Sequence, residues 1–148
     1  MLKNTRKILA SQSGMSLIEI LIALTLLGLA GTFVAGRVNE SLNKGQVDTT
    51  KIQMRSLAER LKEFRRDCNS YPTTDQGLEA LIEKPTGGRE CKRYNPGGYI
   101  DGGKIPQDPW GSEYIYESDG KTFNIISYGV DGEEGGEGYD ADINFKDL

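Results

Sequence analysis

The stretch with the clearest capacity for chemistry is the glycine-rich acidic segment SYGVDGEEGGEGYDADI at residues 127–143. Its glycines, at 129, 132, 135, 136 and 138, let the chain turn backbone carbonyls inward. Calcium takes about six to eight oxygen ligands from carboxylates and carbonyls. The sequence therefore predicts a calcium loop. The acids of residues 129–148 are Asp131, Glu133, Glu134, Glu137, Asp140, Asp142 and Asp147, against one base, Lys146.

Three other interpretations fit parts of the acidic segment. An EF-hand spacing places Asp131, Gly136 and Asp142 at its first, sixth and twelfth positions. That motif needs flanking helices, whereas a strand is expected before the segment and few residues follow it. A phosphate loop is disfavoured because the carboxylates would repel the phosphate. A solvated turn that binds no metal is the remaining alternative.

A second unusual residue is Glu19, the only charge in the apolar run Met15–Gly36. At about 1.5 Å per residue, a helix over this run can span a bilayer. Because a carboxylate in hydrocarbon costs roughly 2.5–3.5 kcal/mol, Glu19 needs a compensating partner unless it snorkels to the interface. Bases precede the run at Lys3, Arg6 and Lys7, which places the N-terminus in the cytoplasm by the positive-inside rule.

The chain has two cysteines, Cys68 and Cys91. The part beyond the apolar run is expected outside the cytoplasmic membrane, where thiols are oxidised. A bridge between the two would close a loop of about 24 residues and contribute roughly 3 kcal/mol to stability. The alternative is a pair of free thiols, and we favour the disulfide.

The composition argues against several classes of function. Without histidine, the chain lacks the commonest general base and the commonest metal ligand, so a hydrolase or zinc enzyme is disfavoured. The net charge of −4 argues against nucleic acid as a partner. Hydrophobic residues make up 36% of the chain, and many lie in the apolar run, so the core of the remaining domain is small and needs support.

One long helix from about residue 16 to 68 is expected to carry these features. No proline occurs between Met15 and Tyr71, and the spacing of Leu57, Leu61, Phe64 and Cys68 places them on one helical face. Gly36 and Gly45 are possible bends, and Tyr71-Pro72 ends the helix. Its first half suits a membrane, and its second half suits the core of a soluble domain.

Smaller elements are expected after the helix. TTDQGLEALIEKP predicts a short helix with Thr74 as its N-cap and Pro85 as its stop. A Gly/Pro-rich connector follows, too broken for regular structure. Asp119-Gly120 then lies between two β-prone runs, which predicts a hairpin over about residues 114–127. The fold class is therefore α+β, with a small antiparallel sheet packed on the helix.

The N-terminus resembles the type IV prepilin leader, in which a short basic peptide ends in glycine and an apolar helix with a fifth-position glutamate follows. Gly14 and Glu19 occupy those positions, although Met15 stands where the family usually has phenylalanine. The resemblance implies that prepilin peptidase cleaves after Gly14 and methylates the amine of Met15. It also implies that Glu19 pairs with that amine on a neighbouring subunit and sets the assembly register.

Most of the chain resembles the major pseudopilins of type II secretion. YPTTDQGLEALIEKP, NPGGYI, DPWGSEYIY and SYGVDGEEGGEGYDADI carry the likeness in that order. The family fold is a long N-terminal helix, an αβ-loop, a small antiparallel sheet and a C-terminal calcium loop. By this resemblance Asp131 is a side-chain calcium ligand, Tyr128 a carbonyl ligand, and Asp140 the preferred second carboxylate with Asp142 as the alternative. The cysteine pair is not part of the family pattern.

The resemblance implies a leader at residues 1–14, a transmembrane and filament-core helix at 15–36, and a periplasmic domain at 37–148. The chain would be a structural subunit rather than an enzyme, anchored in the bacterial inner membrane with its N-terminus cytoplasmic. Its implied partners are other copies of itself, minor pseudopilins, the inner-membrane secretion platform and prepilin peptidase, with no nucleic acid. Alternatives are a type IV pilin of a surface pilus, and a monomeric membrane-anchored calcium module or enzyme that keeps residues 1–14.

Overall fold

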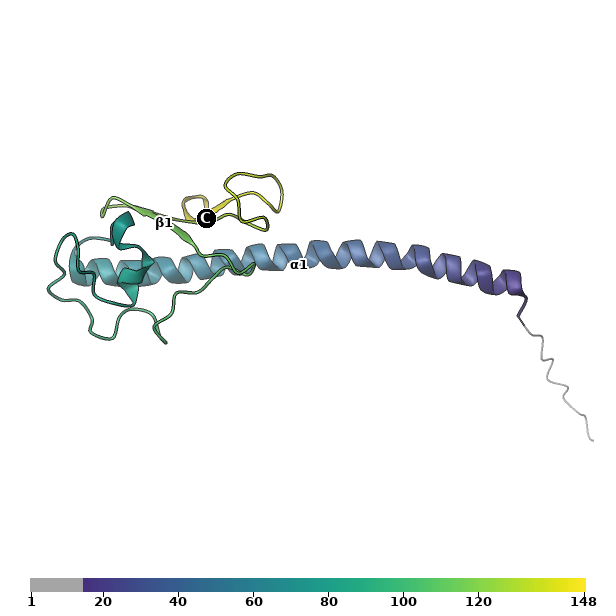
Figure 1. Cartoon of the computed structure of the whole chain (residues 1–148), viewed down its shortest axis with the longest axis horizontal. Coiled ribbons are helices and arrows are strands. Elements are labelled where there is room, and N and C mark those ends of the chain that lie inside the picture. The colour runs from purple at the N-terminus through teal and green to yellow at the C-terminus, as the bar shows by residue number, and fades with distance from the viewer. Residues whose placement is uncertain (1–14) are drawn as a thin grey trace, which may run out of the picture. The chain divides into compact units, whose positions relative to one another are not determined.

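The computed structural model describes residues 15–148, apart from the side chains of residues 33–36 (Figure 1). The chain divides into two units, residues up to Glu40 and residues Ser41–Leu148. The fold is α+β, as the sequence predicts. The elements in order are α1 (Leu17–Cys68), the 3₁₀ helices η1 (Thr74–Gln76) and η2 (Leu78–Leu81), the strands β1 (Ile115–Ser118), β2 (Phe123–Ser127) and β3 (Ile143–Asn144), and the 3₁₀ helix η3 (Phe145–Asp147).

Helix α1 begins and ends within one residue of the prediction, and it continues through Gly45 without a break. Asn69 ends it in a left-handed conformation, with φ of 60°. The N–H of Asn69 still donates to the carbonyl of Arg65 at 2.8 Å. Asparagine is one of the few residues that tolerate this conformation after a helix. Pro72 then keeps the chain from resuming a helical path.

The core of the Ser41–Leu148 unit is formed by the second half of α1 together with side chains from the sheet, η2 and the connector. The predicted helical face is confirmed, because Leu57, Leu61, Phe64 and Cys68 are all buried. Each fully buried side chain of this size contributes roughly 1.5–3 kcal/mol. The buried side chains that pack with this face from the rest of the unit are Tyr71, Leu78, Ala80, Leu81, Cys91, Tyr99, Tyr114, Tyr116, Ile125 and Ile143.

The sheet has three antiparallel strands in the order β1-β2-β3. The predicted hairpin is confirmed, with Ile115 opposite Ile126 and Ser118 opposite Phe123. The turn is held by the Asp119 carboxylate, which accepts the N–H groups of Lys121 and Thr122. Strand β3 was not predicted, since two residues are too few for an alternating pattern.

The short helix predicted from Thr74 is wrong as an α-helix. Two 3₁₀ turns occupy its place, separated by Gly77 at φ of 62°. An L residue reaches that conformation only at a cost, so the glycine ends one turn and starts the next. The N-cap is Thr73 rather than Thr74, and its backbone N–H donates to Oε1 of Gln76 at 3.0 Å.

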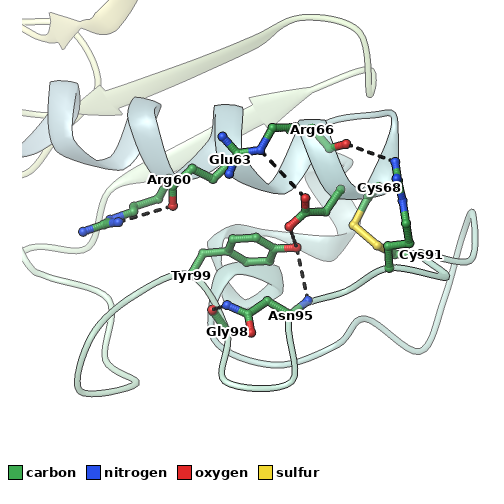
Figure 2. Close-up of polar contacts among 10 residues, drawn as sticks. Arg60, Glu63, Arg66, Cys68, Cys91, Asn95, Gly98 and Tyr99 are labelled. Carbon is green, nitrogen blue, oxygen red and sulfur yellow. Dashed lines mark hydrogen bonds and ion pairs between the residues drawn. A yellow bond between two sulfur atoms is a disulfide. The ribbon is translucent and has the colours of Figure 1, made fainter.

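The connector after η2 holds neither helix nor strand in residues 82–114, which agrees with its glycine and proline content. It is fixed instead by side chains (Figure 2). Cys68 and Cys91 form a disulfide with Cα atoms 4.7 Å apart. The hydroxyl of Tyr99 donates to Asp67 at 3.2 Å. The connector is thereby tied to the last turn of α1 at two points.

We expect loss of the disulfide to lower the free energy of unfolding by about 3 kcal/mol, because the cysteines lie 23 positions apart and the bridge restricts the unfolded chain. Urea unfolding of the full chain in detergent, as wild type and as the double variant Cys68→Ala/Cys91→Ala, measures this difference. Reductant should shift only the wild type. Equal midpoints for the oxidised wild type and the variant would contradict the prediction.

Candidate functional site

The acidic segment forms a loop between β2 and β3. Its two ends are paired, since Ser127 lies opposite Ile143 in the sheet. Within the loop, the N–H of Val130 donates to the carbonyl of Tyr139 at 3.4 Å. The sheet therefore closes the loop at its base, and the residues between are held near one another by the fold rather than by their spacing in sequence.

The two aspartates nearest the ends of the loop turn their side chains back onto its backbone. Oδ1 of Asp131 accepts the N–H of Glu133, and Oδ1 of Asp142 accepts the N–H of Gly135, both at 3.1 Å. Asp140 is exposed and bonds to the loop only through its backbone. Tyr128, predicted as a carbonyl ligand, is half-buried at the start of the loop. The glutamates at 133, 134 and 137 are exposed.

Backbone carbonyls converge on the glycines of the loop. A Cβ atom on Gly129 would lie 2.9 Å from the carbonyl oxygen of Tyr139 and 3.1 Å from that of Ala141. A Cβ on Gly136 would collide with the carbonyl of Asp140. Both glycines also have positive φ, so a side chain is disfavoured at each for two reasons. The glycines thus allow the backbone carbonyls of residues 139–141 to approach the other side of the loop closely.

The potential donors in this loop are oxygens, from carbonyls and carboxylates. Within residues 15–148, no three acidic or cysteine side chains gather closely enough to hold a metal by themselves. A cation here would need carbonyl ligands beside one or two carboxylates. That donor set fits a hard ion such as calcium, and it does not fit zinc, which prefers nitrogen and sulfur.

A buried carboxylate that the sequence did not single out lies under the loop. Asp108, from the stretch DPWG, is 4% exposed and accepts the hydroxyl of Ser127 at 2.7 Å. Ser127 is the last residue of β2. The hydroxyl of Tyr114 also lies in this region, where burial raises its pKa and the Asp108 charge raises it further. The sequence Asp-Pro-Trp-Gly indicates a turn. The contact between Asp108 and Ser127, in contrast, depends on the tertiary fold and could not be predicted from this pattern.

The other candidate functional region is the first part of α1. Every described side chain from Met15 to Thr32 is exposed, including Leu17 at 84% and Glu19 in the first turn. The helix is long and apolar enough to cross a membrane. Its first hydrogen bonds go to the carbonyl of Ser16, which accepts the N–H groups of Glu19 at 2.9 Å and Ile20 at 3.1 Å. Gly14 and the rest of the predicted leader lie outside the described residues.

Two family models match the chain. The model described as type II secretion system (T2SS), protein G, matches residues 37–146. The model described as the prokaryotic N-terminal methylation motif matches residues 9–35. The two matches divide the chain near the end of the apolar run, and together they cover most of it.

The chain is also similar to individual proteins over most of their lengths. It is 40% identical to type II secretion system core protein G of Pseudomonas aeruginosa over 89% of this chain and 93% of that protein. It is 39% identical to the core protein G of Vibrio cholerae over 96% and 99% of the two chains. A crystal structure of the major pseudopilin from the type 2 secretion system of enterohaemorrhagic Escherichia coli matches 71% of this chain and 86% of that one, with TM-score 0.62 and 36% identity.

If the loop binds calcium, excess calcium should raise the melting temperature of the full chain in detergent on the order of 10 °C relative to chelator. A hundredfold excess over the dissociation constant contributes about 2.7 kcal/mol, and a domain of this size gains several degrees per kcal/mol. Magnesium at the same ionic strength should have little effect. Differential scanning fluorimetry with a dye suited to detergent provides the measurement.

The variant Asp131→Ala should abolish the calcium shift because it removes the carboxylate that the sequence predicts as a ligand. The matched control is Glu134→Ala, which removes one exposed carboxylate from the same loop and should keep the shift. Equal losses in the two variants would mean that calcium acts on the loop charge in general. Identical melts of the wild type in calcium and in chelator would make the segment a solvated turn.

Proposed function

The chain belongs to the type II secretion system protein G family, and from that premise we propose how its parts assemble, anchor and stabilise a filament. It is a structural subunit that polymerises into the periplasmic pseudopilus of a type II secretion system, which helps export folded proteins across the outer membrane. The observation that carries this conclusion is the protein G match over residues 37–146, the part that distinguishes pseudopilins from surface pilins. A surface type IV pilin is therefore not favoured.

The chain is a membrane-anchored pseudopilin, and its anchor is the apolar part of α1. We propose that residues 15–36 cross the inner membrane with the N-terminus in the cytoplasm and residues 37–148 in the periplasm. The bases before the apolar run support this orientation. The disulfide supports it as well, because such bonds persist in the oxidising periplasm rather than in the cytoplasm.

In an assembled filament, the exposed apolar side chains of α1 would contact other copies of the chain instead of lipid. When subunits leave the membrane, the side chains from Leu17 onward must be covered by those of other copies. We propose that this stretch forms the filament core. Glu19 would enter that core beside the methylated amine of Met15 from a neighbouring copy, and pairing the two charges would offset most of the cost of burying them.

We propose that calcium stabilises the acidic loop. Asp131 would supply a carboxylate, Tyr128 a backbone carbonyl, and either Asp140 or Asp142 the second carboxylate. The backbone carbonyls packed close to Gly129 and Gly136 and the all-oxygen donor set support this assignment. The bound ion would supply positive charge that offsets the repulsion among the loop acids, and its binding would add to the stability of the folded domain.

Members of this family are structural subunits, and we assign the chain no reaction of its own. Within the secretion system we propose that it contacts prepilin peptidase before assembly, the inner-membrane platform during assembly, and minor pseudopilins in the filament. The methylation motif over residues 9–35 supports the first of these contacts. The net charge of −4 argues against nucleic acid as a partner.

The proposed processing predicts the mass of the mature protein. The mature protein should lack residues 1–14 and carry one added methyl group, because the leader peptidase would cut after Gly14 and methylate Met15. Intact-mass spectrometry of protein purified from membranes measures both changes. Gly14→Val should keep the full chain, unmethylated. A mature wild-type protein that keeps residues 1–14 would contradict the processing proposal and favour a monomeric anchored module.

Assembly makes a second prediction. Glu19→Gln should reach the membrane at normal abundance but lower the filament fraction released from the periplasm by more than about tenfold, because an unpaired buried charge costs about 3–5 kcal/mol. Immunoblots of membrane and filament fractions measure the two pools. The matched control is Glu117→Gln, which removes an exposed carboxylate from β1 and should assemble normally. Filaments of Glu19→Gln at wild-type levels would refute the pairing role.

A further inference from the structure

Asp108 is the one buried acidic side chain among residues 15–148. No lysine or arginine of this part of the chain lies within 4.0 Å of its carboxylate as an ion pair. Hydrogen bonds stabilise the negative charge of the Asp108 carboxylate instead. Oδ1 accepts the N–H groups of Trp110 and Ser112 at 3.1 and 2.8 Å, and Oδ2 accepts the hydroxyl of Ser127 at 2.7 Å.

The two carboxylate oxygens serve different parts of the fold. The turn from Asp108 to Ser112 is already closed by its backbone, since the N–H of Asp108 donates to the carbonyl of Ser112 at 2.9 Å and the N–H of Gly111 donates back to Asp108 at 3.0 Å. Oδ1 reinforces this turn. Oδ2 makes the separate contact with Ser127, which joins the turn to the end of β2. Turn formation alone therefore does not account for the position of the side chain.

Two of the three residues that donate to the Asp108 carboxylate, Ser112 and Ser127, lie against the first residues of the acidic loop. Ser127 precedes Tyr128, and its Oγ also accepts the N–H of Gly129 at 3.4 Å. On the other side, a Cβ atom on Gly132 would lie 3.5 Å from Oγ of Ser112. The first residues of the loop, up to Gly132, therefore run between two serines that are both held by Asp108. Tyr128 and Asp131, which we assign to calcium, fall within this stretch.

We propose that Asp108 is a positioning residue for the calcium loop. It fixes the direction in which the chain leaves β2 and thereby presets the Tyr128 carbonyl and the Asp131 side chain for the ion. The residues around a metal site that orient its ligands commonly change affinity by about 10–100-fold when they are removed. The inference rests on the proposed calcium site, and its test is designed to separate the two.

The test measures the dissociation constant of calcium by isothermal titration of the full chain in detergent, well below the melting transition. Asp108→Ala should weaken binding about tenfold or more. Asp108→Asn should weaken it less than about threefold, because the amide oxygen can accept the two turn N–H groups and the amide nitrogen can donate to Ser127. Ser127→Ala, which keeps the turn and removes only the link to the loop, should weaken binding about as much as Asp108→Ala.

The control is Asp119→Ala, a turn aspartate at the other end of the β1–β2 hairpin that also accepts two backbone N–H groups. It should lower the melting temperature in chelator and leave the calcium affinity unchanged. If Asp108 only stabilised the fold, its variant would likewise lose melting temperature and keep its calcium affinity. Unchanged calcium affinity in both Asp108→Ala and Ser127→Ala would therefore overturn the inference. If Asp108→Ala fails to fold, the calcium affinity of Ser127→Ala alone tests the inference. Absence of calcium binding in the wild type would overturn the calcium site itself and this inference with it.

Discussion

The apolar surface on the first half of α1 is the constraint on which the rest of the molecule depends. Residues 17–32 expose their side chains, and burial of such surface is worth roughly 25 cal/mol for each Å² removed from water. No part of the described chain covers it. In the proposed function, lipid and other copies of the helix are the two environments for this surface, so that anchoring and assembly would use the same side chains.

The soluble domain is built on the continuation of that helix. Its sheet has only three strands, one of them two residues long. A core of this size buries little surface, so the free energy of unfolding that it provides is small. One covalent link and one polar link support it at the C-terminal end of α1. The disulfide and Tyr99 hold the connector to the last turn (Figure 2). Near the start of the unit, Val47 and Lys51 line a hollow with Tyr139 and Ala141 from the acidic loop.

The acidic loop and the DPWG turn form one structural assembly around Asp108. A buried carboxylate without a basic partner is costly, and hydrogen bonds from three donors offset that cost. A nearby calcium ion would add favourable charge to the same region. With the proposed calcium bound, this domain would have a physical reason to combine a buried aspartate with an exposed acidic loop, since the ion would stabilise both.

The sequence by itself determined the long helix, its apolar and amphipathic halves and the hairpin, because periodic patterns and an Asp-Gly turn act over neighbouring residues. It also narrowed the disulfide to a single pair, since there are two cysteines. Local patterns did not reveal β3 or the division of the predicted short helix at Gly77. Only the tertiary structure brought Asp108 to Ser127 and the carbonyls of residues 139–141 to Gly129. Those contacts join segments that are far apart along the chain, and packing of the whole domain decides them.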